Sequence, residues 1–68
     1  MTVGAKMKQT LAGLKSAQAS LETFALETEN QQAKQLFQQM AQQTQGVVSG
    51  LEPRMQEIEQ EEPQYKQQ

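Results

Sequence analysis

Apolar and polar positions follow each other along the chain in steps of three and four, the spacing of one face of an α-helix. A first stripe comprises Val3, Met7, Thr10, Leu14, Ala17, Leu21, Phe24 and Thr28. A second comprises Ala33, Phe37, Met40, Thr44, Val47, Leu51, Met55 and Ile58. Each stripe is a heptad seam of the kind that packs against another helix. The pattern therefore predicts two long helices.

The chain between the stripes carries the signals of a helix boundary. Thr2 is a candidate N-cap for the first helix, and Thr28 or Asn30 can cap the second, with Thr28 and Gln31 fitting a capping box. The sequence thus predicts an all-α fold, an antiparallel two-helix hairpin forming a single domain over residues 1–68. Its expected parts are helix 1 at about 2–27, a turn at about 28–30, helix 2 at about 31–62 and a tail at 63–68.

A chain that folds back near residue 29 brings particular seam residues opposite each other. The expected pairs are Phe24 with Ala33, Leu21 with Phe37, Ala17 with Met40, Leu14 with Thr44, Thr10 with Val47, and Met7 with Leu51. Most pairs combine a large side chain with a small one, as interdigitated packing requires. This pairing supports the hairpin.

Pro53 interrupts the second helical pattern. Proline lacks the backbone N–H and crowds the carbonyl of Ser49, so a kink is expected over residues 50–53, with Gly50 absorbing the distortion. The spacing of the second stripe also changes here, because Val47, Leu51 and Met55 follow each other in steps of four. Such a stutter locally unwinds a coiled coil.

Further apolar residues lie beside the two stripes. They are Leu11, Ala25, Leu36, Ala41, Val48 and Met55. Ile58 is expected to project beyond the first helix, and Tyr65 can lay its ring on apolar surface near the end. Helices often expose a few leucines harmlessly. In so short a chain we favour an oligomer, with Leu11, Leu36, Val48, Met55, Ile58 and Tyr65 at the interface, and a dimer of hairpins forming a four-helix bundle is the simplest arrangement.

Composition and charge sharpen this expectation. The chain has 68 residues, no cysteine and a net charge of −2, so a single small core must hold it together without disulfides. Lysines lie near the start and glutamates near the end. We expect charge contacts between chains that involve Lys6, Lys8, Glu57, Glu61 and Glu62. The glutamine-rich middle is interleaved with apolar residues, which favours a folded helix with a neutral polar face over disorder.

The residue types for catalysis are missing. The chain has no histidine or cysteine to activate its serines, and its four glycines are scattered rather than gathered in a phosphate loop. Glu57 and Glu61 lie at helical neighbour spacing, but carboxylates alone on a helix favour a solvated acidic end over a metal site. We expect no enzyme activity, cofactor, metal or small-molecule substrate. The acidic balance and the few aromatic residues also argue against nucleic-acid binding.

A membrane surface is the main alternative partner. Val3, Met7, Leu11 and Leu14 together with Lys6, Lys8 and Lys15 make the first half of helix 1 a basic amphipathic segment. The same apolar residues can instead fill the hairpin core, and we favour that use. No stretch reads as a signal peptide or a bilayer span, so the protein is expected to be soluble and cytoplasmic, or at most peripheral to a membrane.

Three segments carry a family resemblance. They run from Met1 to Leu26, from Asn30 to Gln45, and over the "LEPRMQEIEQEEPQYK" stretch, whose LEPR and EEPQY parts are the most specific. Over about Thr2 to Lys66 the chain resembles the small proteins of domain-of-unknown-function family 1657. Members of that family occur in endospore-forming bacteria and are commonly encoded beside dipicolinic-acid channel proteins and other spore membrane proteins.

The resemblance implies a sporulation or spore-resistance context and supplies no activity. With the pattern of the residues, it leads to the prediction of a non-enzymatic, self-associating structural or adaptor protein. The expected partners are a second copy and, through the family context, a spore membrane protein. The expected location is the cytoplasm of the forespore or spore, or the surface of the spore inner membrane. The alternative function is a peripheral membrane binder that uses the first half of helix 1.

Overall fold

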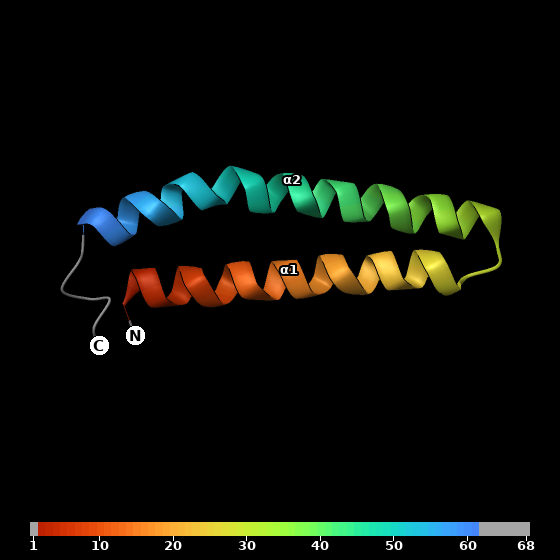
Figure 1. Cartoon of the computed structure of the whole chain (residues 1–68), viewed down its shortest axis with the longest axis horizontal. Coiled ribbons are helices and arrows are strands. Elements are labelled where there is room, and N and C mark those ends of the chain that lie inside the picture. The colour runs from red at the N-terminus through yellow and green to blue at the C-terminus, as the bar shows by residue number, and fades with distance from the viewer. Residues whose placement is uncertain (1, 62–68) are drawn as a thin grey trace.

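The computed structural model describes residues 2–61 as two long helices joined by a short turn. Helix α1 spans Val3–Glu27 and helix α2 spans Gln31–Glu61. Figure 1 shows them side by side and antiparallel, with the turn at one end and the start of α1 beside the last turns of α2 at the other. The predicted all-α class and the hairpin are confirmed. The predicted tail, together with Glu62, lies outside the described residues.

Side-chain caps fix where both helices begin. The Thr2 hydroxyl accepts a hydrogen bond of 3.1 Å from the Ala5 N–H, as predicted for the N-cap of α1. The side-chain carbonyl of Asn30 accepts one of 2.9 Å from the Ala33 N–H at the start of α2. Each cap satisfies a backbone donor that a helix start would otherwise leave without a partner. Of the two candidate caps for α2, the structure uses Asn30.

Thr28 caps the end of α1 instead, and Lys34 connects the two helices beside the turn. Thr28 is the C-cap residue of α1, and its N–H donates to the Phe24 carbonyl at 3.0 Å. The Lys34 ammonium donates to the Ala25 carbonyl at 2.6 Å, reaching from the first turn of α2 to the last turn of α1. A cation is favourable beside the partial negative charge of a helix C-terminus. This contact holds the two helices together next to the turn.

A heptad seam runs along the facing sides of the helices. On α1 its buried or half-buried members are Gly4, Met7, Leu11, Leu14, Gln18, Leu21, Ala25 and Thr28. On α2 they are Lys34, Phe37, Ala41, Thr44, Val48, Leu51, Met55 and Ile58. We call these sixteen residues the core seam. Its centre is the cluster of Leu11, Val48 and Met55, with Met7, Leu14 and Leu51 packed against it.

Every second member of the first predicted stripe lies in this seam, and the second predicted stripe contributes all its members except Ala33, Met40 and Val47. Val3, Phe24 and Val47, expected in the core, are 61%, 47% and 50% exposed. Their places are taken by residues one position further along, of which several are small. Small side chains let two helix backbones approach closely: a β-carbon added to Gly4 would lie 3.5 Å from Ile58 Cγ2. At three of these positions the seam residue is smaller than the predicted one: Gly4 replaces Val3, Ala25 replaces Phe24 and Ala41 replaces Met40.

Helix α2 continues through Pro53 without interruption. Figure 1 shows it bowed, with its convex side away from α1 around residue 50 and its C-terminal part inclined toward the start of α1. Pro53 is exposed, on the solvent side, where a lost hydrogen bond favours a bend with this sense. The bend brings Ile58 over Gly4, and Ile58 is only 6% exposed. The prediction that nothing in α1 covers Ile58 is therefore wrong.

The predicted stutter is also absent from the core seam. Thr44, Val48, Leu51, Met55 and Ile58 keep alternating steps of four and three across Pro53. The stutter arose from placing Val47 in the seam instead of Val48. With Val48 in place, the heptad period of α2 is unbroken from the turn to its end.

The two helices pair about one helical turn away from the predicted register. Folding back at residue 29 would place Gly4 opposite residue 53 or 54, but it meets Ile58, about four residues further along α2. Near the turn, the Phe37 ring packs edge-on against Phe24, with centroids 5.6 Å apart, rather than opposite Leu21 alone. The first residue of α2 that belongs to the core seam is Lys34, three residues after the helix begins. The pairing with α1 therefore starts further along α2 than predicted.

Candidate interaction surfaces

The core seam leaves two flanks, one on each side of the hairpin. Positions before and after the seam residues of a heptad lie on opposite sides of the contact between two helices. We call one side the polar flank, formed by Lys8, Lys15, Gln45, Glu52 and Glu59. We call the other the apolar flank, formed by Val3, Ala17, Phe24, Leu36, Met40 and Val47. The two flanks differ in chemistry although both helices contribute to each.

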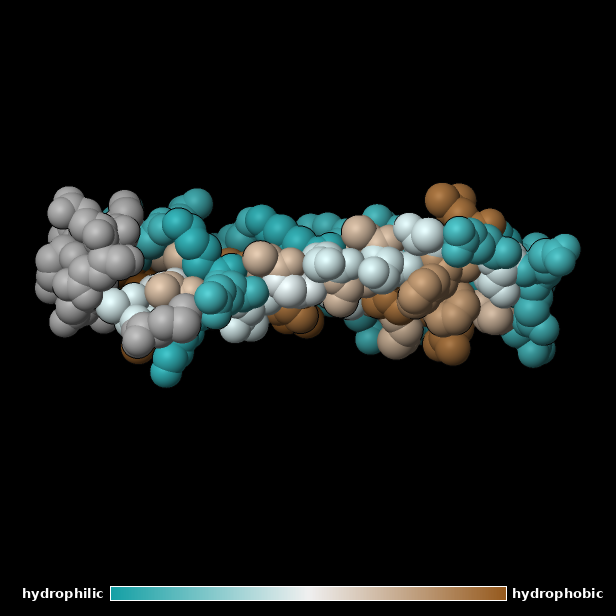
Figure 2. Space-filling model, turned by 90° about the horizontal axis from the view of Figure 1, so that it is seen from below, coloured by the Kyte–Doolittle hydropathy of each residue, from teal (hydrophilic) through white to brown (hydrophobic). Residues whose placement is uncertain are grey.

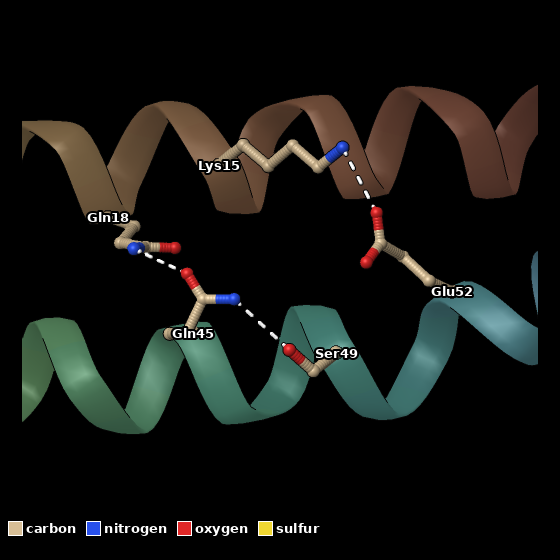
Figure 3. Close-up of polar contacts among 5 residues, drawn as sticks. All are labelled: Lys15, Gln18, Gln45, Ser49 and Glu52. Atoms are coloured by element: carbon tan, nitrogen blue, oxygen red, sulfur yellow. Dashed lines mark hydrogen bonds and ion pairs between the residues drawn. The ribbon is translucent and has the colours of Figure 1, made fainter.

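Ion pairs between the helices lie on the polar flank. The Lys15 ammonium is 3.3 Å from a carboxylate oxygen of Glu52 (Figure 3), and Lys8 is 3.9 Å from Glu59. These side chains keep much of their exposure, so each pair stabilises the hairpin by only about 0–1 kcal/mol. Their larger effect is on geometry, because opposite charges favour one alignment of the helices.

An amide network continues the polar flank toward the turn. The Gln18 amide donates to the Gln45 side-chain oxygen at 2.7 Å and to a Glu22 carboxylate oxygen at 3.2 Å. Gln45 in turn donates to the Ser49 hydroxyl at 3.1 Å, and Figure 3 shows this chain of contacts crossing between the helices. Gln18 is a member of the core seam, so one polar layer interrupts the apolar packing.

A shallow groove lies beside this network on the turn half of the hairpin. Its lining comprises Gln18, Glu22, Ala25, Leu26, Gln38, Ala41, Gln42 and Gln45. Buried Ala25 and Ala41 form its floor, and Leu26, 81% exposed, stands at its rim. Among residues 2–61 there is no cluster of three or more acidic, histidine or cysteine side chains arranged to hold a metal ion. The polar groups that line the groove are glutamine amides and the Glu22 carboxylate.

The apolar flank exposes large side chains from both helices. Val3, Phe24 and Val47 are roughly half exposed or more, and Leu36 is 52% exposed. Figure 2, which looks onto the hairpin from the α1 side, shows hydrophobic surface gathered over the half nearest the turn and hydrophilic surface toward the other end. Exposed apolar side chains that adjoin one another, unlike scattered ones, are typical of a contact surface.

The predicted interface residues are divided by the structure. Leu11, Val48, Met55 and Ile58 are 2–8% exposed and belong to the hairpin's own core, so the expectation that they are available to another chain is wrong. Leu36 lies on the surface, in the apolar flank. For Leu11 and Val48 the physical reason is the one-position displacement of the seam, and for Ile58 it is the shifted register that brings it over Gly4. Tyr65 lies outside the described residues.

Three of the charged residues predicted to meet another chain, Lys8, Glu57 and Glu61, have ion-pair partners within this one. Arg54 contacts Glu57 at 3.3 Å and Glu61 at 3.8 Å on its own helix. Lys8 faces Glu59, whereas Lys6 takes part in no ion pair among residues 2–61. Glu62 lies outside the described part of the chain. Contacts of these groups with a neighbouring chain remain a prediction.

One sequence signal for the true register was missed. Lys8 and Lys15 are seven residues apart, and so are Glu52 and Glu59. In an antiparallel hairpin these two pairs match in reverse order, which is the arrangement that the structure shows. Heptad-spaced opposite charges beside a seam select its alignment. This signal would have placed the flank and the register correctly.

Neither α1 nor α2, as far as residue 61, has a stretch both long and apolar enough to cross a bilayer. The lysines of the proposed lipid-binding half of α1 lie mainly on the polar flank, and Leu11 is buried against α2. In the closed hairpin, therefore, the basic and apolar residues of this half do not form one amphipathic surface.

Comparison with known proteins places the chain in a family. A family model described as "Protein of unknown function (DUF1657)" matches residues 7–55, which cover most of both helices and the turn between them. No curated protein and no solved structure matches significantly. Since the match extends over well more than half of the sequence, the chain belongs to the DUF1657 family.

Proposed function

We propose that this protein is a non-enzymatic helical component that associates with itself and serves as a structural or adaptor element in the spore-forming cell. The observation that carries self-association is incomplete burial. Four large apolar residues of the apolar flank, Val3, Phe24, Leu36 and Val47, stay about half exposed or more. A chain of this size, with no disulfide, gains much from a second layer of helices.

A structural or adaptor role fits the chemistry of the surface. The polar flank presents amides and ion-paired side chains, which suit recognition better than reaction. The chain has no histidine or cysteine, the residues on which most nucleophilic and general-base sites depend. The spore context and a spore membrane protein as the docking partner rest on the family resemblance alone.

Sedimentation equilibrium at micromolar concentration tests self-association directly. We expect a species larger than the 7.6 kDa chain. A folded monomer over the whole accessible range would refute this part of the proposal. Imaging of a tagged copy during sporulation tests the context: accumulation in the forespore is expected, and equal amounts in the forespore and the mother cell would contradict it.

The membrane-binding alternative is separated by flotation with anionic vesicles. Because Lys8 and Lys15 face glutamates and Leu11 is buried, we expect the protein to remain in the fraction that does not float. Strong flotation that is lost in the double variant Lys6→Glu and Lys8→Glu would favour the alternative instead. A closed hairpin can still dock on a membrane protein through either flank.

A further inference from the structure

We infer that the apolar flank is the surface through which two copies of the chain associate, side by side, with their turn halves in contact. This inference rests on the proposed self-association and adds the surface and the arrangement. The result is a four-helix bundle in which the polar flanks of both copies face solvent.

The period of the apolar flank is the first reason to assign it to a second copy. On α1 its members Val3, Ala17 and Phe24 fall on one seven-residue repeat, as do Met40 and Val47 on α2. This is the repeat of the core seam, so the flank follows the same left-handed supercoil as the hairpin itself. A partner stays in contact along such a surface only if its helices have the same period. A second copy of this chain meets that condition.

The charges around the apolar flank argue against a lipid surface as the occupant. The positions on its outer edge carry Lys6 and Glu27 from α1 and Glu57 from α2, with neutral residues between them. Interfacial helices that bind anionic lipid place an excess of lysine or arginine beside the apolar face. Here Lys8 and Lys15 lie on the opposite flank and face glutamates. The edge of the apolar flank thus combines acidic, basic and neutral residues without a basic excess, and a polar rim around apolar residues is typical of contacts between proteins.

The distribution of apolar side chains indicates which halves meet. Phe24, Leu36 and Met40 lie within the turn half, and Figure 2 shows the hydrophobic surface concentrated there. Toward the other end α2 carries Arg54 with its two glutamate partners, which would be costly to desolvate at the centre of an interface. Contact between the two turn halves buries the first group and leaves the second in solvent.

Engineered cysteines test the surface, because the chain has none of its own. Met40→Cys on α2 and Ala17→Cys on α1 report on the apolar flank, and Gln38→Cys and Gln45→Cys, both on α2, report on the opposite side of the hairpin at similar heights. Under mild oxidation, alone and mixed in pairs, the apolar-flank variants should form disulfide-linked dimers at least about tenfold faster than the controls. Circular dichroism of each reduced variant verifies the fold.

Two exposed leucines provide a matched pair of substitutions that tests the same surface without cross-linking. Leu36→Gln removes an apolar side chain from the apolar flank, whereas Leu26→Gln makes the same change at the rim of the polar groove. We expect Leu36→Gln to weaken association by about tenfold or more and Leu26→Gln to leave it unchanged, with helix content retained in both.

The outcomes separate this inference from the proposal beneath it. An oligomer that cross-links faster through Gln45→Cys and Gln38→Cys, or through neither set, would overturn the apolar-flank assignment and leave self-association intact. A monomer at all concentrations would overturn both. Equal effects of the two leucine substitutions on a confirmed oligomer would likewise reject the assignment.

Discussion

Val47 and Val48 are neighbours in the sequence with opposite surroundings. Val48 keeps 2% of its surface exposed at the centre of the core seam, and Val47 keeps 50% on the apolar flank. Truncating a buried valine removes its transfer free energy and leaves a cavity, whereas truncating an exposed one does neither. The two residues therefore test the position of the seam directly.

We predict that Val48→Ala lowers the free energy of unfolding by about 1.5–3 kcal/mol and that Val47→Ala lowers it by less than about 0.5 kcal/mol. Urea unfolding followed by circular dichroism should be measured at the lowest practical protein concentration, where association contributes least. If Val47→Ala were the more destabilising substitution, the core seam would contain Val47 and not Val48.

Gly13 is a glycine that the fold does not require. A β-carbon at this position would have no neighbour within 4 Å, and the residue lies in the middle of α1. Gly13→Ala should therefore raise the free energy of unfolding by about 0.5–1 kcal/mol, because alanine loses less backbone entropy in a helix. A thermal melt should show a higher Tm. An unchanged or lower Tm would mean that another chain approaches this backbone closely.

Ile58 tests whether the end of α2 packs on the start of α1. Its side chain is buried against Gly4, so Ile58→Ala should cost about 2–4 kcal/mol of stability within the hairpin itself. Glu57→Ala, an exposed neighbour, is the matched control and should change stability by less than about 0.5 kcal/mol. Equal unfolding midpoints for the two variants would show that the end of α2 is not packed on α1.

At the scale of the helix, the start of α2 depends on one side chain. Asn30 accepts the Ala33 N–H, and no other side-chain cap is recorded at this end among the described residues. Asn30→Ala should destabilise the hairpin by about 1 kcal/mol, whereas Asn30→Asp keeps the acceptor and should be nearly neutral. Chemical unfolding of the three proteins side by side measures this. Equal losses in both variants would indicate that the amide acts by something other than capping.

The helices themselves were predictable because their signals are local. The steps of three and four, the Thr2 cap and the turn before Gln31 depend on residues close in sequence, and the structure confirms them. The choice of face was not predictable from apolar size. Val3 and Phe24 are larger than Gly4 and Ala25, yet the smaller residues face α2 because they let the backbones approach.

Because the wrong helix face was predicted to lie in the core, several residues of the core and of the outer surface were predicted in each other's place. Leu11 and Val48 were assigned to an outer flank and lie in the core, while Val47, assigned to the core, lies outside. The existence of a second apolar surface was inferred correctly, because the sequence holds more apolar residues per turn than one helix contact buries. Which surface is which depends on how the two helices pair, and that pairing joins residues far apart in the chain.

At the scale of the whole molecule, added salt distinguishes the ion pairs of the polar flank, which contribute to the stability of the hairpin, from the apolar flank, which is proposed to hold two copies together. Raising the salt to about 1 M shortens the Debye length to about 3 Å and screens exposed ion pairs such as Lys15 with Glu52. We expect the free energy of unfolding to fall by no more than about 1–2 kcal/mol for the two pairs between the helices. Association through the apolar flank should persist or strengthen, as sedimentation in high salt would show. Dissociation under these conditions would indicate that charge holds the copies together.

The antiparallel course of α1 and α2 places the start of one beside the last turns of the other (Figure 1). Any segment that precedes α1 or follows α2 is consequently attached at this one end. The turn stands about 40 Å away, the length of roughly 25 helical residues. A fluorescent protein or a surface tether joined before Thr2 would therefore sit far from Phe24 and Leu36 and leave the turn half accessible. The proposed contact between turn halves is therefore compatible with an attachment at the open end of the hairpin.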